Sequence, residues 1–454
     1  MHAPVSRYVP PHPPRGGPVP VWRGFFGERA RTAVYGWSEG AFSQTHILRN
    51  VLGYRVHIPL EPDSVQRVLL DNAANYQKPG LVKKLLRRTV GRGLLSSDGA
   101  LWREQRKIVS ASFVPSAVDA LVPSFARAAR LAMESWQPST TDMAEQATAT
   151  TMRVIADSLF GGDPRLITVE AMAHISAALE GVSEARLQIM LGVPLVPWSL
   201  RGRRAHKGQQ YLRTTLARLV EERIAEGKGV RGDFLDKLIS ALNLRFEPAE
   251  AHDLAVDNAA TFYLAGHETT SNAITWTLFL LSEQPDLQEE AAAEARAALS
   301  TGEDDPGLPD RLPLLRRILE ESMRVYPPVP RFDREAVAAD RLGEAEILPG
   351  DIVSIWPWLL HRHRKLWDDA DAFDPDRFLP EAKAERHRFQ YLPFGGGPRL
   401  CVGARFAQFE ALTILSHWIA RWRFSPMPGR LVQTSGMVTL RPKGGLPLRL
   451  ERRD

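Results

Sequence analysis

The sequence has almost no cysteine: Cys401 is the only one among 454 residues. An intramolecular disulfide is therefore excluded, which is typical of proteins from a reducing compartment such as the cytoplasm. The sequence also has no run of about 18 apolar residues, and its N-terminus lacks the basic and apolar regions of a signal peptide. We therefore expect a cytoplasmic protein without a transmembrane anchor.

Motifs of several common enzyme classes are also absent. The sequence contains no H-E-x-x-H, no paired C-x-x-C and no G-x-x-x-x-G-K-[ST], which argues against the zinc and phosphate sites that these patterns form. His361 and His363 lie close together in "LHRHR", and we assign them a structural role rather than a metal. Lysine and arginine total 58 against 53 acidic residues. So small a surplus does not predict binding to nucleic acid.

Proline is concentrated at the start of the chain, with seven in the first twenty residues. This composition predicts an extended or mobile arm over residues 1–20. No repeat or linker divides the remainder, so we expect a single domain over residues 21–454. Apolar residues make up 44% and charged residues 24%, as in ordinary globular proteins.

Helical periodicity and proline positions predict the main elements. Small and apolar residues recur at helical spacing over residues 249–282, which predicts a helix far longer than the average of about 11 to 12 residues. Pro285 and Pro313 each begin a further helix, and the second must end before Pro327. A strand is expected at residues 54–60 and a last helix at residues 404–422. The fold class is therefore mainly α with small β-sheets (α+β).

The cysteine lies in the stretch "FGGGPRLCVG", residues 394–403. A thiolate is a soft ligand suited to iron, and a flat cofactor across the loop requires a backbone without side chains, which three glycines provide. Arg399 could bind a carboxylate, and the helix that follows would favour the thiolate of Cys401. Two alternatives are a buried free cysteine beside a glycine-rich turn and a cysteine-nucleophile hydrolase with histidine and Asn or Asp partners.

This stretch resembles the haem-binding signature of the cytochrome P450 monooxygenases, F-G-x-G-x-R-x-C-x-G. The resemblance implies that Cys401 ligates the iron of haem b, held between the long central helix and the cysteine loop. Other family marks follow in family order over roughly residues 21–450. The signature positions are filled by Phe394, Gly395, Gly397, Arg399, Cys401 and Gly403.

Two further marks occur on the expected helices. "EESMR" places Glu321 and Arg324 three residues apart on one helix face. The resemblance implies that this pair, with Arg377 of "DPDRF", forms a structural network that holds the cysteine loop. "AGHETT" lies in the middle of the long helix, where a small residue, a helical glycine and an adjacent acid and alcohol are compatible with an oxygen pocket and a proton path. The catalytic candidates there are Ala265, Gly266, Glu268 and Thr269.

"LWREQR" places an indole and a guanidinium on one helix face, at Trp102 and Arg106. By resemblance these residues hydrogen-bond a haem propionate, together with Arg399 and Arg334. Arg331 is a further candidate.

The resemblance implies a monooxygenase that inserts one atom of O2 into a small hydrophobic substrate such as a fatty acid, terpenoid, steroid or alkylated aromatic. Electrons would come from NAD(P)H through a separate ferredoxin and ferredoxin reductase, and the enzyme would be a monomer. An isomerase, dehydratase or peroxide-driven enzyme on the same fold is an alternative, and so is a haem-binding sensor without turnover. Candidate docking residues for the acidic ferredoxin are Arg103, Lys107, Arg399 and Arg405.

Overall fold

A computed structural model describes residues 7–16, 32–51, 53–180, 199–227, 229–436 and 438–453. Its helices are α2 Pro62–Gln66, α3 Gly80–Val90, α4 Gly99–Ser110, α5 Pro115–Asp119, α6 Val122–Met133, α7 Met143–Leu159, α8 Val169–Glu180, α10 Leu200–Glu226, α11 Phe234–Asn243, α12 Pro248–Ser282, α13 Pro285–Leu299, α14 Pro313–Val325, α15 Pro357–Leu360, α16 Pro380–Ala384 and α17 Ala404–Arg421. Its strands are β1 His46–Val51, β2 Tyr54–Pro59, β3 Tyr76–Gln77, β4 Thr140–Asp142, β5 Phe332–Ala336, β6 Asp340–Leu342, β7 Ala345–Ile347, β8 Ile352–Ile355, β9 Trp422–Pro426, β10 Thr434–Ser435, β11 Arg441–Pro442 and β12 Pro447–Arg452.

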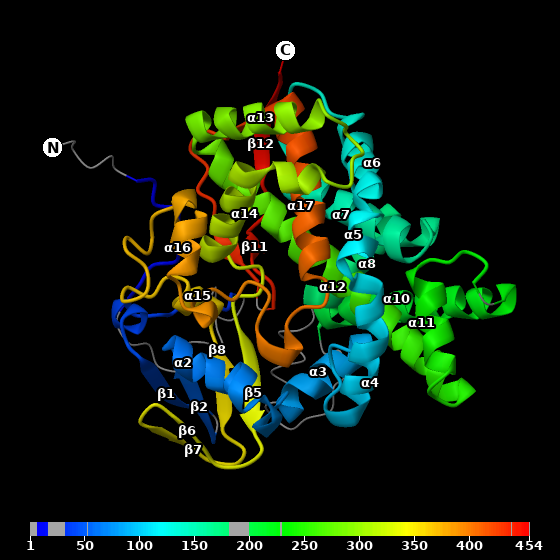
Figure 1. Ribbon diagram of the computed structural model, residues 1–454, viewed down its shortest axis with the longest axis vertical. Helices are drawn as coiled ribbons and strands as arrows, with labels where there is room; N and C mark the ends of the chain where they lie inside the picture. Colours follow the sequence, from blue (N-terminus) through cyan, green and yellow to red (C-terminus); the bar gives the residue numbers. More distant parts are fainter. Residues whose placement is uncertain are drawn as a thin grey trace.

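Helix α12 runs through the middle of the molecule and organises the fold (Figure 1). It has 35 residues and begins with Pro248, because proline is well tolerated where the first N–H groups have no helical partner. It packs against α7, α10, α11, α14 and α17, so most of its side chains are buried. The long helix that the periodicity predicted is confirmed, as are the helices that begin at Pro285 and Pro313.

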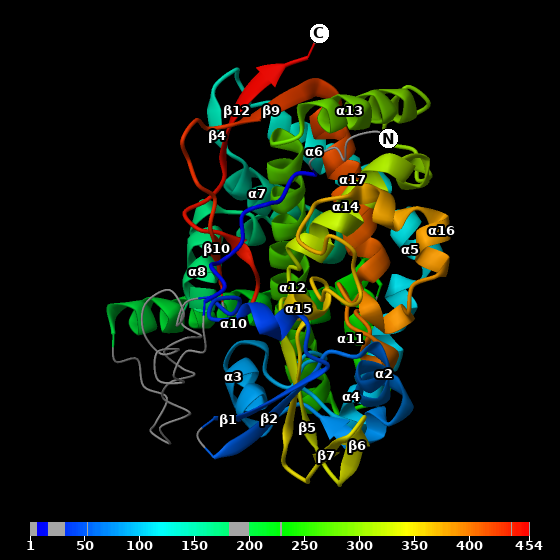
Figure 2. The same ribbon diagram turned by 90° about the vertical axis from the view of Figure 1, so that its left-hand side faces the viewer.

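Small sheets lie at both ends of α12 (Figure 2). A five-stranded sheet has the order β1-β2-β8-β5-β3, in which only the β2–β8 pair is parallel. At the opposite end, β12 pairs with β4 and β9. The expected strand at residues 54–60 is β2, and the predicted mainly α class with small sheets is confirmed.

The part of the N-terminal arm that the structure describes, residues 7–16, has no helix or strand, as expected for a proline-rich segment. It is nevertheless held on the body of the protein, because the side chain of Arg15 is only 8% exposed and binds Asp371. Residues 7–16 are thus extended, one of the two forms that the composition predicted. The rest of the predicted arm, residues 1–6 and 17–20, lies outside the described residues.

Within the described residues, no single helix is both long and apolar enough to cross a bilayer. The criterion of length and composition is met only by the segments Gly99–Phe113 and Pro115–Met133 taken together, which bend by 54°.

Candidate active site

The only cysteine lies on a tight loop directly before α17. The backbone N–H of Cys401 donates to the carbonyl oxygen of Phe394 at 3.0 Å, and the N–H of Leu400 donates to that of Gly397 at 3.0 Å. The Cys401 side chain is exposed, whereas most α17 residues from Phe406 onward are buried. The loop therefore presents the thiol at an accessible position directly before a largely buried helix.

Two glycines of this loop have the same backbone conformation but different surroundings. The φ angle is 74° at Gly395 and 66° at Gly397, a region that L side chains rarely adopt. A Cβ on Gly397 would stand 1.7 Å from the carbonyl oxygen of Leu69, so this glycine allows close approach to the short helix η3 (Arg67–Asp71). A Cβ on Gly395 would have no protein atom within 4 Å. The space beside Gly395 is open, as a flat cofactor requires.

Opposing influences act on the acidity of the Cys401 thiol. Burial raises its pKa, whereas a hydrogen bond from the Gly403 N–H and the positive charge of Arg106 lower it. A cation at the sulfur would favour the thiolate further.

Cationic side chains gather around Asp98, the N-cap residue of α4. Arg399 forms an ion pair with Asp98 and donates to the carbonyl oxygen of Ser97 at 3.1 Å. Its guanidinium carbon also lies 4.2 Å from the ring centroid of Trp102, a cation–π contact. Arg399 is thus fixed over the Trp102 indole of α4.

Lys78 and Arg334 also belong to this cluster. Burial, followed by the charges of Arg399 and Arg334, lowers the pKa of Lys78 to about 7. Burial and Arg399 likewise lower the pKa of Arg334 to about 10. Lys83 is a further cation, 3.3 Å from Asp98, and Asp333 is a second carboxylate that acts on Arg334. Four cations against two carboxylates leave the cluster electrostatically suited to additional anionic groups. Arg331, the fourth candidate, instead binds Asp333 at 2.8 Å.

Trp102 and Arg106 both lie on α4. Within the described residues, neither the Trp102 indole nor the Arg106 guanidinium donates a hydrogen bond to the protein. Arg106 lies close enough to Cys401 that the sulfur raises the pKa of its guanidinium, although burial lowers it more. The two side chains could therefore bind an acceptor that the protein itself does not provide.

The middle of α12 contains the only exposed residue between Thr261 and Thr270, Ala265. The Thr269 hydroxyl donates to the Ala265 carbonyl oxygen at 2.8 Å, a bond within the helix. Gly266 has a packing reason, because a Cβ there would stand 2.5 Å from Cδ1 of Ile155 on α7. An alanine at this position would require the Ile155 side chain to move, so α12 and α7 pack closely here.

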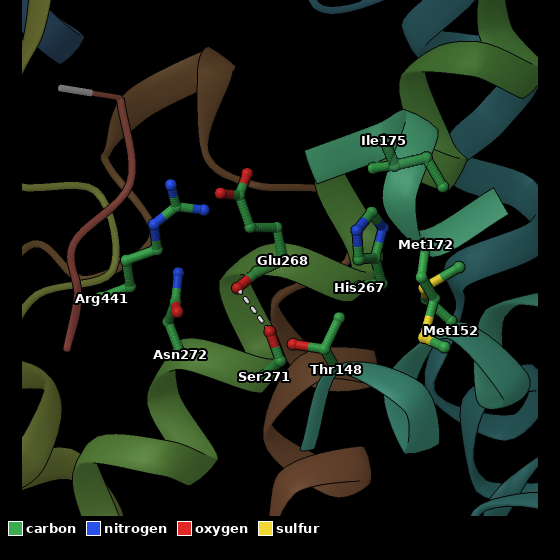
Figure 3. Close-up of a pocket in the computed structure, with 9 residues that line it drawn as sticks. All are labelled: Thr148, Met152, Met172, Ile175, His267, Glu268, Ser271, Asn272 and Arg441. Atoms are coloured by element: carbon green, nitrogen blue, oxygen red, sulfur yellow. Dashed lines mark hydrogen bonds between the residues drawn. The ribbon is translucent and has the colours of Figure 1, made fainter. Parts of the chain in front are cut away.

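Glu268 lines a small pocket between α12, α7, α8 and β11 (Figure 3). Its carboxylate accepts a hydrogen bond from the Thr439 hydroxyl at 2.6 Å. Arg441 and Asn272 line the same pocket, whose volume of about 50 Å³ is sufficient for one or two waters. The acid is therefore in contact with a polar, hydratable space.

The network around α14 is fully buried. Arg324 donates from Nε and one Nη to the two carboxylate oxygens of Glu321, each at 2.7 Å, and both side chains are 0% exposed. Its other bonds go to the carbonyl oxygens of His361, Ala370 and Ala372, each at 2.7 Å. The structure thus brings the predicted pair together.

Arg377, the third member of the predicted network, lies beside this pair with weaker contacts. Its Nε is 3.6 Å from a Glu321 oxygen, and it donates to the Asp369 carbonyl at 3.0 Å.

Together these features fit a flat cofactor that is bound through sulfur and carries carboxylates. The cytochrome P450 family profile matches residues 42–447, most of the chain. The protein is a cytochrome P450. Its family implies haem iron and the use of O2, and this chain is a monooxygenase of the oxidoreductase class.

Individual relatives agree with this assignment. The P450 is 32% identical over 392 residues to cyclooctatin synthase from Streptomyces melanosporofaciens, covering 85% of this chain and 84% of that protein. It is 29% identical over 380 residues to cyclooctat-9-en-7-ol 5-monooxygenase from the same organism, covering 83% and 81%. The haem domain of cytochrome P450DA superposes with a TM-score of 0.81 at 23% identity, covering 98% of each chain, which shows the shared fold.

Sequence reasoning missed Lys78 and Thr439. Both make their contacts with distant segments, since Thr439 lies 171 residues from Glu268 along the chain. The sequence motif around Lys78, "YQKPG", indicates only a turn. No local signal identifies either residue.

Proposed function

We propose that this P450 oxygenates a large apolar molecule that carries few polar groups, with haem b bound through Cys401 and electrons from a separate acidic ferredoxin. The observation that carries the proposal is the exposed Cys401 thiol on a loop with open space at Gly395. Haem bound to a cysteine thiolate activates O2, so that one oxygen atom enters the substrate and the other leaves as water with two protons and two electrons.

The protein holds the propionates and the loop. We propose that Trp102, Arg106, Arg334 and Arg399 bind the propionates, and that Lys78 adds a fifth cationic or hydrogen-bonding partner. The free donors of Trp102 and Arg106 and the excess positive charge around Asp98 support this role. The Glu321–Arg324 pair keeps the cysteine loop in place through buried backbone contacts.

Protons would reach the reaction site through two adjacent residues. The Glu268 carboxylate takes up a proton from the hydrated pocket, where Thr439 fixes its orientation. The Thr269 hydroxyl, next in the chain, holds the last proton beside exposed Ala265. An acid that faces water and an alcohol that faces the reaction site give a relay across the width of α12.

The substrate class is supported by an exposed apolar side chain on the loop before α4. The loop before α4 packs directly on α12, since a Cβ on Gly93 would stand 2.6 Å from the Asp257 carbonyl oxygen. Leu95 on this loop is 40% exposed, although it lies between buried Leu94 and Ser96. The name of one relative, cyclooctat-9-en-7-ol 5-monooxygenase, specifies an unsaturated alcohol. Together they favour a terpenoid-like alcohol or hydrocarbon over a polar substrate.

A substrate panel tests this proposal. Oxidised, haem-loaded protein is titrated with terpenoid alcohols, fatty acids, steroids and alkylated aromatics, and the Soret band is followed. We expect the largest shift with the terpenoid alcohols, and the shift should weaken in Leu95→Asp. The reduced carbon monoxide complex should absorb near the position typical of thiolate-bound haem in the parent, and that band should be lost in Cys401→Ala. Persistence of the band in Cys401→Ala would disprove the ligand assignment.

The ferredoxin would dock on α4. Of the four candidates, Arg399 and Arg405 already pair with Asp98 and Asp119, the latter at 2.7 Å. Arg103 and Lys107 are exposed and lie four residues apart on one face of α4. Arg106 lies between them in the sequence. Docking on this face would bring the donor close to Cys401, and the attraction should weaken as salt screens the charges.

Charge-reversal variants test whether the ferredoxin docks on this face of α4. Arg103→Glu and Lys107→Glu should each slow reduction by an acidic ferredoxin at low salt and flatten the dependence of the rate on ionic strength. Arg449→Glu is the matched control, since Arg449 is 68% exposed on β12, at the opposite end of the molecule from α4 (Figure 1). Equal rates in all three variants would rule out docking on α4.

A further inference from the structure

The segment from Asp369 to Asp374, between α15 and the short helix Pro375–Phe378, is bound from two sides. On one side Arg324 donates to the carbonyl oxygens of Ala370 and Ala372, each at 2.7 Å. On the same side the Asp374 N–H donates to Glu321 at 2.8 Å. Alternate residues of the segment are thus tied to the buried pair on α14.

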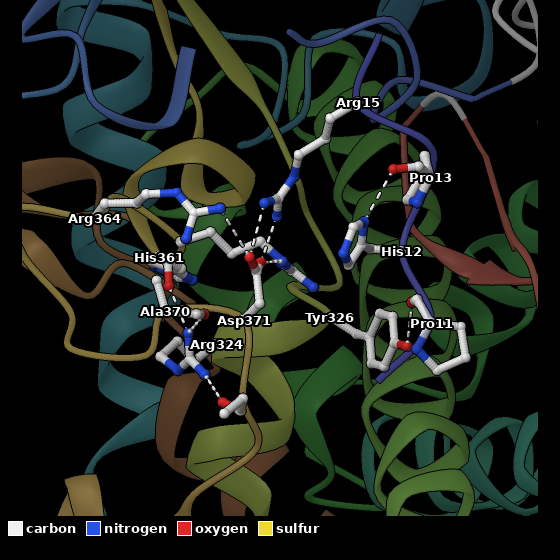
Figure 4. A network of polar contacts seen from close by, with 12 residues as sticks. Pro11, His12, Pro13, Arg15, Arg324, Tyr326, His361, Arg364, Ala370 and Asp371 are labelled. Carbon is white, nitrogen blue, oxygen red and sulfur yellow. Dashed lines mark hydrogen bonds and ion pairs between the residues drawn. The ribbon is translucent and has the colours of Figure 1, made fainter. Parts of the chain in front are cut away.

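The intervening residues are tied to the N-terminal arm (Figure 4). Arg15 forms two hydrogen bonds with the Asp371 carboxylate, one of them at 2.7 Å. The Phe373 N–H donates to the Tyr8 carbonyl oxygen at 2.9 Å. The arm and the buried pair therefore hold opposite edges of the same strip of backbone.

The arm is itself anchored to the core. The Tyr326 hydroxyl donates to the Pro11 carbonyl oxygen at 2.6 Å. The guanidinium carbon of Arg15 lies 3.9 Å from the ring centroid of Phe42, and the Phe42 side chain is buried. An arginine that combines a two-point carboxylate contact with an aromatic face is not matched by lysine.

The strip is connected to the cysteine loop through His361. Arg324 donates to the His361 carbonyl oxygen at 2.7 Å, and the ring Nε2 of His361 accepts a hydrogen bond from the Leu392 N–H at 2.8 Å. The Leu392 carbonyl oxygen in turn accepts from the Gly395 N–H at 3.3 Å, at the start of the cysteine loop. The predicted structural role of His361 is confirmed, and it links the two regions.

We propose that Arg15 is a positioning residue for the Cys401 loop, acting through Asp371 and the strip that Arg324 holds. The N-terminal arm closes the outer edge of the strip, and Arg324, His361 and Leu392 transmit its position to Gly395. Loss of Arg15 releases this edge without leaving a bare carboxylate, because Arg364 remains 3.3 Å from Asp371. Its effect is therefore on geometry more than on charge.

Arg15→Ala tests the proposal in the full chain. Backbone amide hydrogen exchange in the haem-free protein should become on the order of tenfold faster at Leu392 and Gly395, the factor expected when a contact to a charged group is lost. In the haem-loaded protein, transfer of haem to apomyoglobin should accelerate by a similar factor, and the carbon monoxide complex should lose the absorption band of thiolate-bound haem faster. Arg15→Lys should restore these properties only in part.

Controls separate this role from general stability. Arg130→Ala removes another ion pair, with Asp304 at 2.8 Å, on α6 far from the strip in the chain, and should change none of these readouts. If amide exchange at Leu392 and Gly395 in Arg15→Ala equals that of the parent, the proposal is wrong. The haem readouts rest on the proposed role of Cys401, whereas amide exchange does not, so failure of either proposal can be recognised.

Discussion

Alanine substitution at the two loop glycines tests whether the loop is bare to make room for a cofactor. Both residues have a positive φ, so alanine costs about 1–2 kcal/mol of backbone strain, partly offset by about 0.4–1 kcal/mol from a less flexible unfolded chain. At Gly395 no protein atom lies within 4 Å of the new Cβ, so the free energy of unfolding of the haem-free protein should fall by only about 1 kcal/mol.

Gly397→Ala should be clearly worse in the haem-free protein. Its Cβ would stand 1.7 Å from the Leu69 carbonyl oxygen, whereas ordinary contact begins at 3.4 Å. Because the clash is with backbone atoms, a change of side-chain rotamer cannot relieve it. Overpacking of this kind costs about 1–3 kcal/mol in addition to the strain. Because unfolding entropy is about 2.1 cal/mol/K per residue, each kcal/mol shifts the Tm of a chain of 454 residues by about 1 °C.

Relative to its change in stability, Gly395→Ala should lose more haem affinity than Gly397→Ala. If the cofactor lies against Gly395, its Cβ occupies cofactor space, and Gly395→Ala should lose haem to apomyoglobin faster than its small change in Tm predicts. Differential scanning fluorimetry of haem-free protein and the transfer rate of loaded protein give both quantities. Wild-type haem retention in Gly395→Ala would refute the argument and leave backbone conformation as the only reason for this glycine.

Three further predictions concern protons and charge. Thr269→Ala should keep haem and substrate affinity but divert NAD(P)H electrons into hydrogen peroxide, measured as product and peroxide per NAD(P)H consumed; unchanged coupling would remove Thr269 from the relay. Thr439→Val should free the Glu268 carboxylate and alter the pH profile of coupling, whereas Thr439→Ser should not. Because burial lowers the pKa of Lys78 to about 7, the unfolded chain binds more protons above pH 7, and this residue makes the stability of the haem-free protein rise with pH until about pH 10. Lys78→Met should abolish that contribution in thermal unfolding measured across this range, and an unchanged slope would contradict the assigned environment.

The sequence predicts those parts of the fold whose signals are local. Proline marks the first turn of α12, α13 and α14, and the helical periodicity of α12 persists for the whole 35 residues because nearly every face is buried. The E-x-x-R spacing places Glu321 and Arg324 on one face, which is sufficient to predict their contact.

Contacts between distant segments are not predictable in the same way. The orientation of Glu268 depends on Thr439, whose segment returns to α12 only after the chain has formed the cysteine loop and α17. The environment of Lys78 depends on two arginines from β5 and the cysteine loop. The docking of the arm requires Asp371, more than 350 residues later, so composition alone predicts its extended form but not its attachment.

Arg324 makes more contacts than the E-x-x-R motif predicts. A guanidinium has five N–H donors, and all five are used: two by Glu321 and three by backbone carbonyl oxygens. Backbone acceptors impose no residue type, so these partners leave no trace in the sequence. A buried arginine without them would leave unsatisfied donors in the core, which is costly. The chain must therefore bring the carbonyl oxygens of His361, Ala370 and Ala372 to Arg324 whatever their side chains.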